Sequence, residues 1–152
     1  MAEPARKVVT TGDTVWLHSV RFGDYHVPAD RLLSFPEGLI GFPEARRFAL
    51  LEPGRPGSPF RCLLCLDDPE LGFVVCDPTT LWPGYAADLP PPEAGRVEDL
   101  AVLAIVTVPS NAQEMTINLM APLVIDCGSR TGRQHVLDTG HYSTRHPLLR
   151  RG

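Results

Sequence analysis

The residues whose types and spacing most clearly suggest chemistry are Cys62 and Cys65. Their Cys-Leu-Leu-Cys spacing is that of a zinc or redox pair. The apolar run around them, residues 60–66, predicts a β-strand, and residues three apart in a strand point to opposite faces. Cys76 and Cys127 stand singly and supply no second pair. We therefore interpret the cysteines as small buried hydrophobic residues, and we keep a metal-bound redox module as an alternative.

Acidic residues gather between two apolar runs, at Asp67, Asp68 and Glu70. Paired carboxylates serve acid–base catalysis in many enzymes. Adjacent aspartates in a four-residue connection are more simply explained as the solvated turn of a hairpin formed by residues 60–66 and 71–77. A small β-barrel enzyme of unknown substrate, using these carboxylates or a histidine, stays as a second alternative.

No catalytic or phosphate-binding motif accompanies these residues. The chain has no Gly-x-Ser-x-Gly nucleophile elbow, and the glycine-bounded residues 128–132 lack the Lys-Ser/Thr of a phosphate loop. The histidines are interpreted as surface or partly buried residues: His18, His26, His135, His141 and His146. The sequence therefore predicts neither a metal site nor a cofactor.

Length and composition are those of one globular domain. The chain has 152 residues, 43% of them hydrophobic, and a formal net charge of −4, which argues against direct binding of nucleic acid. No stretch approaches the roughly 20 apolar residues of a membrane span. No apolar region follows the first residues as it does in a secretory signal. We therefore expect a cytoplasmic protein that does not associate with membranes.

The densest apolar segments, residues 100–108 and 115–126, must organise the fold. The first is rich in Val and Ile and nearly continuous, which predicts a strand covered on both faces. The second contains Pro122, which cannot donate a hydrogen bond to a neighbouring strand. We therefore predict a central hairpin in which one arm bends at the proline.

Shorter strands are predicted around this pair, at residues 14–20, 32–35, 48–51, 60–66, 71–77 and 134–137. Residues 23–30 are polar and predict a turn. One helical turn is predicted at residues 44–48, after Pro43, and another within residues 93–99. The predicted fold is all-β, a small single-domain β-barrel-like pseudobarrel of about ten short strands with one or two short helical turns.

A long irregular connection, residues 81–92, carries Trp82 and Tyr85. Aromatic side chains in such a loop are favoured anchors of protein interfaces. The other interpretation is that both residues fold back as a plug over the end of the barrel. The sequence leaves these two interpretations open.

Four motifs in a fixed order carry a family resemblance. They are Phe-Pro-Glu-Gly-Leu-Ile-Gly-Phe at residues 35–42, Asp-Asp-Pro-Glu-Leu-Gly-Phe at 67–73, Asn-Leu-Met-Ala-Pro at 118–122, and Tyr-Ser-Thr-Arg-His-Pro-Leu at 142–148. Together they resemble the flagellar assembly factor family (FliW), over most of the chain. One departure is Leu64, where relatives usually carry Gln.

The resemblance implies a cytoplasmic, β-barrel-like adaptor without catalysis or cofactor, monomeric when free. Members of this family bind flagellin and also CsrA, the carbon storage regulator, which represses translation of flagellin mRNA. The implied mechanism is partner switching. The free factor antagonises CsrA, and accumulating flagellin takes the factor back so that repression returns.

From this we expect a partner-binding surface made by an apolar patch, an acidic hairpin and the aromatic loop. Its candidate residues are Leu39, Ile40, Phe42, Asp67, Asp68, Glu70, Trp82 and Tyr85. A second set is expected to serve the structure: Gly38, Gly41, Asn118, Pro122 and Gln134. The expected domain organisation is a flexible N-terminal extension over residues 1–11, a FliW-like β-barrel domain over 12–148 and a tail over 149–152, the end of a basic stretch that begins at residue 141.

Overall fold

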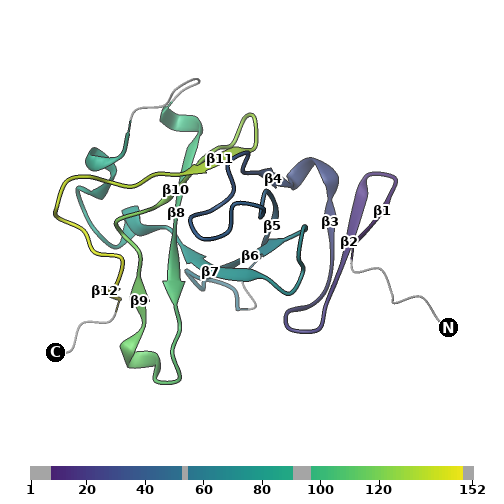
Figure 1. Cartoon of the computed structure of the whole chain (residues 1–152), viewed down its shortest axis with the longest axis horizontal. Coiled ribbons are helices and arrows are strands. Elements are labelled where there is room, and N and C mark those ends of the chain that lie inside the picture. The colour runs from purple at the N-terminus through teal and green to yellow at the C-terminus, as the bar shows by residue number, and fades with distance from the viewer. Residues whose placement is uncertain (1–7, 53–54, 91–96, 149–152) are drawn as a thin grey trace.

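The computed structural model of the chain describes residues 8–52, 55–90 and 97–148 (Figure 1). The strands are β1 (Val8–Thr11), β2 (Thr14–Ser19), β3 (Gly23–Pro28), β4 (Leu33–Ser34), β5 (Arg47–Leu51), β6 (Arg61–Cys65), β7 (Gly72–Cys76), β8 (Leu100–Thr107), β9 (Thr116–Ile117), β10 (Leu123–Asp126), β11 (Thr131–Gln134) and β12 (His146–Pro147). The helices are single 3-10 turns: η1 (Ala29–Arg31), η2 (Pro78–Thr80), η3 (Tyr85–Asp88), η4 (Val97–Asp99) and η5 (Ala112–Glu114). This confirms the all-β fold class. No helix among the described residues is long and apolar enough to cross a membrane.

The larger sheet closes on itself into a barrel. Its strands follow the order β10-β11-β4-β5-β6-β7-β8, and the additional pairing of β10 with β8 joins the two ends. The strand pairs are antiparallel except at one place, where β11 pairs in parallel with β4 through Thr131 and Ser34. The barrel interior is filled by large apolar side chains, among them Phe35, Phe48 and Leu63, none of which is exposed.

The central pair has the predicted form. Strand β8 pairs with β9 through its C-terminal half and with β10 through its N-terminal half. Pro122 lies in the bend between β9 and β10, where no ladder needs its missing N–H. The side chain of Asn118 supports the same bend, because its Oδ1 accepts a hydrogen bond from the backbone N–H of Ala121 at 3.0 Å.

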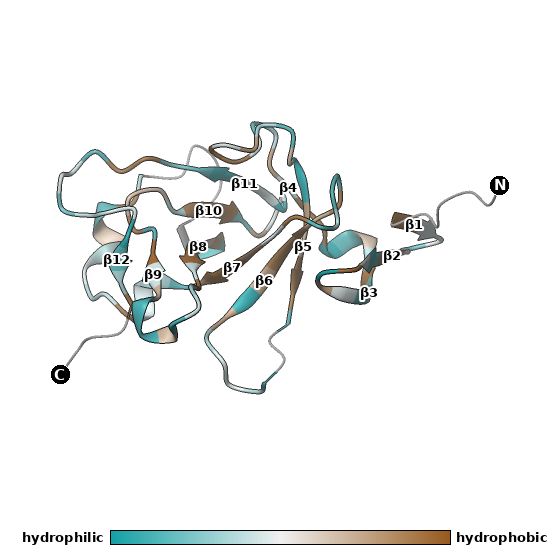
Figure 2. Cartoon of the chain, turned by 60° about the horizontal axis from the view of Figure 1, so that its bottom comes forward, coloured by the Kyte–Doolittle hydropathy of each residue, from teal (hydrophilic) through white to brown (hydrophobic). Residues whose placement is uncertain are grey.

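A separate three-stranded sheet, β1-β2-β3, packs on the outside of the barrel, at the right of Figure 1. Val15, Leu17 and Val27 of this sheet cluster with Ala49 and Leu64 of strands β5 and β6. Strands β5 and β6 are therefore covered on both faces, and they are strongly apolar in Figure 2. Leu64 is fully buried under this sheet and offers no contact surface of its own.

Several local predictions were wrong. Residues 23–28 form strand β3 and not a turn. The segment looked polar in the sequence because only one face of β3 is covered and its polar residues lie on the open face. Val8–Thr11 form strand β1, within the segment expected to be a flexible extension; residues 1–7 lie outside the described part of the chain. Because β1 pairs with β2 along its whole length, this stretch is ordered by the second sheet.

The remaining differences concern element ends. Residues 44–48 form no helical turn, and strand β5 begins at Arg47 instead. The last barrel strand, β11, ends at Gln134 where the predicted strand began. The C-terminal stretch is more than a tail, because its His146–Pro147 pair with β9 as β12. Of the helical turn predicted within 93–99, the structure describes Val97–Asp99, which form η4.

Candidate functional site

The structure joins two of the three predicted contact regions in one recess of about 410 Å³. We call it the groove. It lies between the loop of residues 38–43, the groove loop, and the tip of the β6–β7 hairpin. Its lining residues are Gly41, Phe42, Pro43, Glu44, Ala45, Cys65, Asp67, Asp68 and Leu71. The floor is therefore apolar, and the rim carries carboxylates.

Backbone geometry shapes the groove loop. Gly38 has a positive φ of 70°, and a Cβ there would stand 2.4 Å from the carbonyl oxygen of Pro43. Gly41 also has a positive φ, of 86°. Leu39 and Phe42 hydrogen-bond to each other through both backbone groups, at 2.8 and 3.0 Å. The glycines thus serve the turn, as predicted from the sequence.

The tight turn divides the apolar side chains of this loop. Leu39 is 3% exposed and belongs to the barrel core, so it has no surface for a partner, unlike what the sequence suggested. Ile40 is 60% exposed and Phe42 is 42% exposed. The Phe42 ring packs edge-on against Phe73 with 5.4 Å between ring centroids, which holds it at the mouth of the groove.

Gln134 ties the groove loop to the barrel. Its Oε1 accepts a hydrogen bond from the backbone N–H of Ile40 at 2.8 Å, and its Nε2 donates to the carbonyl of Ala121 at 3.0 Å. Ala121 precedes the buried Pro122 at the β9–β10 bend. Gln134, like Asn118, therefore satisfies backbone groups, which is the structural role that the sequence predicted for both.

The carboxylates of the acidic hairpin are used in different ways. Asp67 accepts hydrogen bonds from the backbone N–H groups of Arg46 and Arg47, both at 3.0 Å, and its other oxygen lies 3.3 Å from the Arg47 guanidinium. Partial burial would raise the pKa of Asp67, but these donors outweigh it and hold that pKa below its usual value. Asp67 therefore braces the start of β5.

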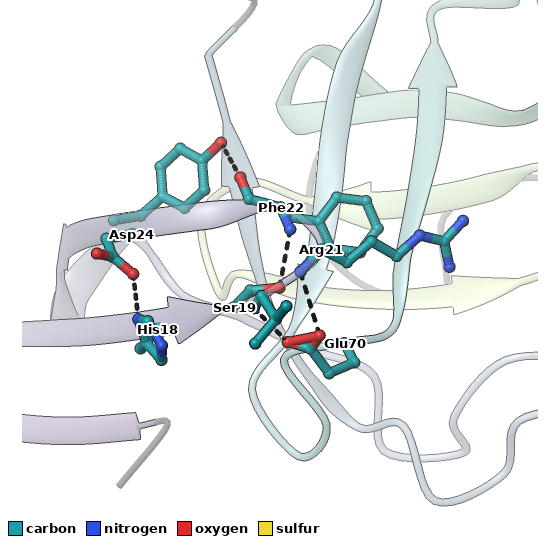
Figure 3. A network of polar contacts seen from close by, with 8 residues as sticks. His18, Ser19, Arg21, Phe22, Asp24 and Glu70 are labelled. Atoms are coloured by element: carbon teal, nitrogen blue, oxygen red, sulfur yellow. Dashed lines mark hydrogen bonds and ion pairs between the residues drawn. The ribbon is translucent and has the colours of Figure 1, made fainter. Parts of the chain in front are cut away.

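Glu70 connects the two sheets. Its carboxylate accepts hydrogen bonds from the backbone N–H groups of Val20 and Arg21, at 2.7 and 3.2 Å, in the turn between β2 and β3 (Figure 3). Asp68 accepts a hydrogen bond from the backbone N–H of Glu70 at 3.1 Å and is exposed. Asp68 is thus an exposed acidic residue at the groove, as is Glu44.

The third predicted region lies elsewhere. Residues 81–89, which we call the plug segment, pack with β8, β9 and the C-terminal stretch. Tyr85 is 1% exposed, and its hydroxyl donates to the carbonyl of Leu119 at 2.7 Å. Trp82 is half-buried, and its Nε1 donates to His146 Nε2 at 3.2 Å. Tyr85 is therefore no interface anchor, because its ring and its hydroxyl are both used inside the molecule.

The cysteines confirm the strand argument. Cys65 points into the barrel core, whereas Cys62 packs on the opposite side, against the β1–β3 sheet. Burial raises the pKa of both thiols and raises that of Cys76 to about 11. Among the residues that the structure describes, no group of three or more His, Cys, Asp or Glu side chains is placed to hold a metal ion.

Sequence reasoning missed part of the groove. Leu71 and Cys65 line its floor and Glu44 stands at its rim, yet none was a candidate. Phe73, which supports the Phe42 ring, belongs to the predicted strand 71–77 and to the 67–73 motif, and neither assigns it to a contact surface. The sequence feature that could have identified Cys65 and Leu71 is the predicted hairpin, because the tip of a hairpin brings residues near 65 and 71 together.

Fold and groove together define a small closed β-barrel whose external loops carry an apolar recess with an acidic rim. The family model described as FliW protein matches residues 16–148. The flagellar assembly factor FliW of Natranaerobius thermophilus is 38% identical over 137 residues, covering 86% of this chain and 90% of that protein. That of Carboxydothermus hydrogenoformans is 36% identical, covering 87% and 88%.

A solved crystal structure of the flagellar assembly factor FliW has the same fold. It superimposes with a TM-score of 0.78 at 29% identity, covering 90% of this chain and 98% of that one. The chain belongs to the FliW family of flagellar assembly factors.

Proposed function

We propose that this chain is a non-enzymatic adaptor of flagellar assembly that acts in the cytoplasm, free of membrane, and binds flagellin and the translational regulator CsrA in alternation. Membership of a family of flagellar assembly factors supports a role among protein partners. Free of flagellin, the adaptor binds CsrA and relieves its repression of flagellin translation. It has no direct contact with nucleic acid and is a monomer when unbound.

The observation that carries this proposal is the groove beside two exposed apolar side chains. Ile40 and Phe42 are presented by a loop whose backbone is fixed by Gln134 and by the turn at Gly38. An amphipathic helix binds by laying its apolar face into such a recess. Because the loop is already ordered, a helical segment of flagellin binds here with little further ordering of the adaptor.

The acidic rim suits a partner with basic groups. The exposed residues Glu44 and Asp68 both line the groove, and the chain carries a net charge of −4. A basic RNA-binding regulator is attracted to such a surface, which raises the association rate more than the affinity. We assign the apolar floor to flagellin and the acidic rim to CsrA, so that the two partners overlap at Phe42 and Asp68.

A competition experiment tests the switch. The full chain is mixed with CsrA of the same host, the complex is isolated by size exclusion, and flagellin is added in increasing amounts. We expect flagellin to release CsrA in proportion to the flagellin complex formed. A stable complex of all three proteins contradicts alternation, and no complex with either partner contradicts the adaptor function.

A variant pair tests the groove. We expect Ile40→Ser to weaken flagellin binding about tenfold, because it removes an exposed aliphatic anchor at the interface. Val108→Ser is the matched control, since Val108 is 54% exposed, directly follows β8 and does not line the groove. Equal flagellin affinity of the two variants, measured by titration calorimetry, places the flagellin site elsewhere.

A further inference from the structure

The open face of the β1–β3 sheet holds a second recess, of about 290 Å³. Strands β2 and β3 place Trp16 opposite His26 and His18 opposite Asp24. The Trp16 and His26 rings lie 5.0 Å apart between centroids, and Trp16 is 50% exposed. Val9 of β1 stands beside Trp16 on the same face. This recess is separate from the groove and shares no lining residue with it.

The side chains that line this recess indicate what kind of group could bind there. Its lining residues are Val9, Trp16, Leu17, His18, Asp24, Tyr25 and His26, and these include one carboxylate, Asp24, and no Lys or Arg. The Nδ1 of His18 contacts one Asp24 oxygen, while the Asp24 side chain stays 74% exposed (Figure 3). An aromatic face beside a carboxylate attracts an organic cation, and guanidinium in particular stacks on indole.

The edge of the sheet adds a place for a backbone. Strand β1 ends the sheet order and, among the described residues, pairs with β2 alone. A two-residue turn, Gly12-Asp13, joins β1 to β2, and Gly12 has a positive φ of 59°. In a hairpin with such a turn, the residues on either side of it, here Thr11 and Thr14, form a hydrogen-bonded pair. By the antiparallel alternation, the N–H and C=O of Thr10 then point to the open edge.

We propose that this face is a docking site for an extended, arginine-bearing segment of a protein partner. The segment adds to the sheet along β1, and its arginine lies over Trp16 and His26 with its charge against Asp24. Strand addition supplies main-chain hydrogen bonds, and the aromatic recess provides specificity for the arginine side chain. Strand β1 precedes residues 16–148 that match the family model, so this site includes a strand outside the matched region.

The test uses a defined probe, the peptide Ac-Thr-Val-Arg-Val-Thr-NH2, titrated into the full ¹⁵N-labelled chain. Its comparator carries citrulline in place of arginine and so has nearly the same shape without the charge. We expect the Trp16 indole N–H and the Thr10 amide to shift, and the Trp82 indole N–H to stay in place. We expect the citrulline peptide to bind roughly two- to fivefold more weakly.

Two substitutions separate the parts of the site. Asp24→Asn is expected to reduce binding of the arginine peptide to that of the citrulline peptide, while the charge-matched control Asp138→Asn leaves it unchanged. Thr10→Pro removes an outward N–H that β2 does not use, and is expected to abolish the shifts with the fold intact. Equal binding of the two peptides, an Asp24→Asn variant that binds like the wild type, or no shift at Trp16 overturns the proposal.

Discussion

The groove loop and the plug segment both carry aromatic side chains, yet the fold uses them in opposite ways. In the groove loop Phe42 remains 42% exposed at the rim of a recess. In the plug segment Tyr85 is buried and its hydroxyl meets the carbonyl of Leu119. A buried hydroxyl needs a partner, and this one has a backbone acceptor at the β9–β10 bend. The difference shows that an aromatic residue in a loop indicates an interface only after its polar atom is accounted for.

The largest effect is expected in the plug segment. Tyr85→Ala is expected to lower the free energy of unfolding by about 3–5 kcal/mol, because it leaves a cavity in the core. Phe42→Ala is expected to lower it much less, since that ring is partly exposed. Urea denaturation of both variants measures the contrast. Equal losses contradict the distinction between plug and groove.

Removing only the hydroxyl tests the same point more finely. Tyr85→Phe is expected to cost about 1–2 kcal/mol of stability, because the Leu119 carbonyl loses its donor while the packing stays. The measurement is again the unfolding midpoint in urea. A variant as stable as the wild type shows that packing alone holds the plug segment.

Each region also has a glycine with positive φ, and these form a matched pair. In Gly38→Ala the new Cβ meets the Pro43 carbonyl, whereas in Gly84→Ala it has no atom within 4 Å. Both variants carry backbone strain of about 1 kcal/mol. We expect Gly38→Ala to lose roughly 1–2 kcal/mol more than Gly84→Ala and to weaken flagellin binding. Thermal unfolding compares them, and equal losses show that the groove loop relaxes freely.

The two regions are expected to respond to opposite ends of the pH scale. At the groove, the folded-state pKa of Asp67 is lowered from 3.8, so its contribution is complete above that value and is lost as the pH falls through the folded pKa. Asp67→Asn is expected to lose less stability in acid than the wild type does, measured by urea unfolding from pH 6 to 3. Parallel curves show that Asp67 adds nothing.

At the plug segment the sign is reversed. The hydrogen bond that Tyr142 donates to Asp88 raises the pKa of Tyr142 above 10.0. Its contribution is therefore complete below that value and is lost as the pH rises through the folded pKa. The effect is expected to be the smallest of this series, because both groups are near the surface. Tyr142→Phe is expected to remove this pH dependence. The free energy of unfolding of the variant, measured in urea, should then fall less steeply above pH 9 than that of the wild type.

The barrel was largely predictable from the sequence because its central strands β5, β6 and β8 are covered on both faces. Residues 100–108 form a nearly continuous apolar run, which leaves little choice but a central strand. Strand β3, which is covered on one face only, was missed because Asp24 and His26 alternate with Tyr25 and Val27. The mean hydropathy of these four residues is low, so the short segment resembles a polar turn. Pattern is a weak guide where only one face is covered.

The candidate site was half predictable. The apolar motif of the groove loop was visible, but nothing local shows that Leu39 turns inward and Ile40 outward. That division depends on the Gly38 turn and on Gln134, which is 94 residues from Ile40 in sequence. The uses of Asp67 and Glu70 were likewise hidden, because their partners are backbone N–H groups that lie between 20 and 50 residues away in sequence. Long-range hydrogen bonds of this kind leave no periodic signal.

The parallel contact between β4 and β11 has a consequence for the order of folding during synthesis. Arg130 donates from its side chain to the Leu32 carbonyl, 98 residues away in sequence, and the adjoining strands close the barrel there. Contacts of such high sequence separation form late and limit the folding rate. Until residues near 134 have left the ribosome, the nascent chain is an open sheet with β4 as an unpaired edge, and the groove loop lacks its Gln134 anchor. Binding competence therefore arises only after Gln134 has been synthesised and has left the ribosome.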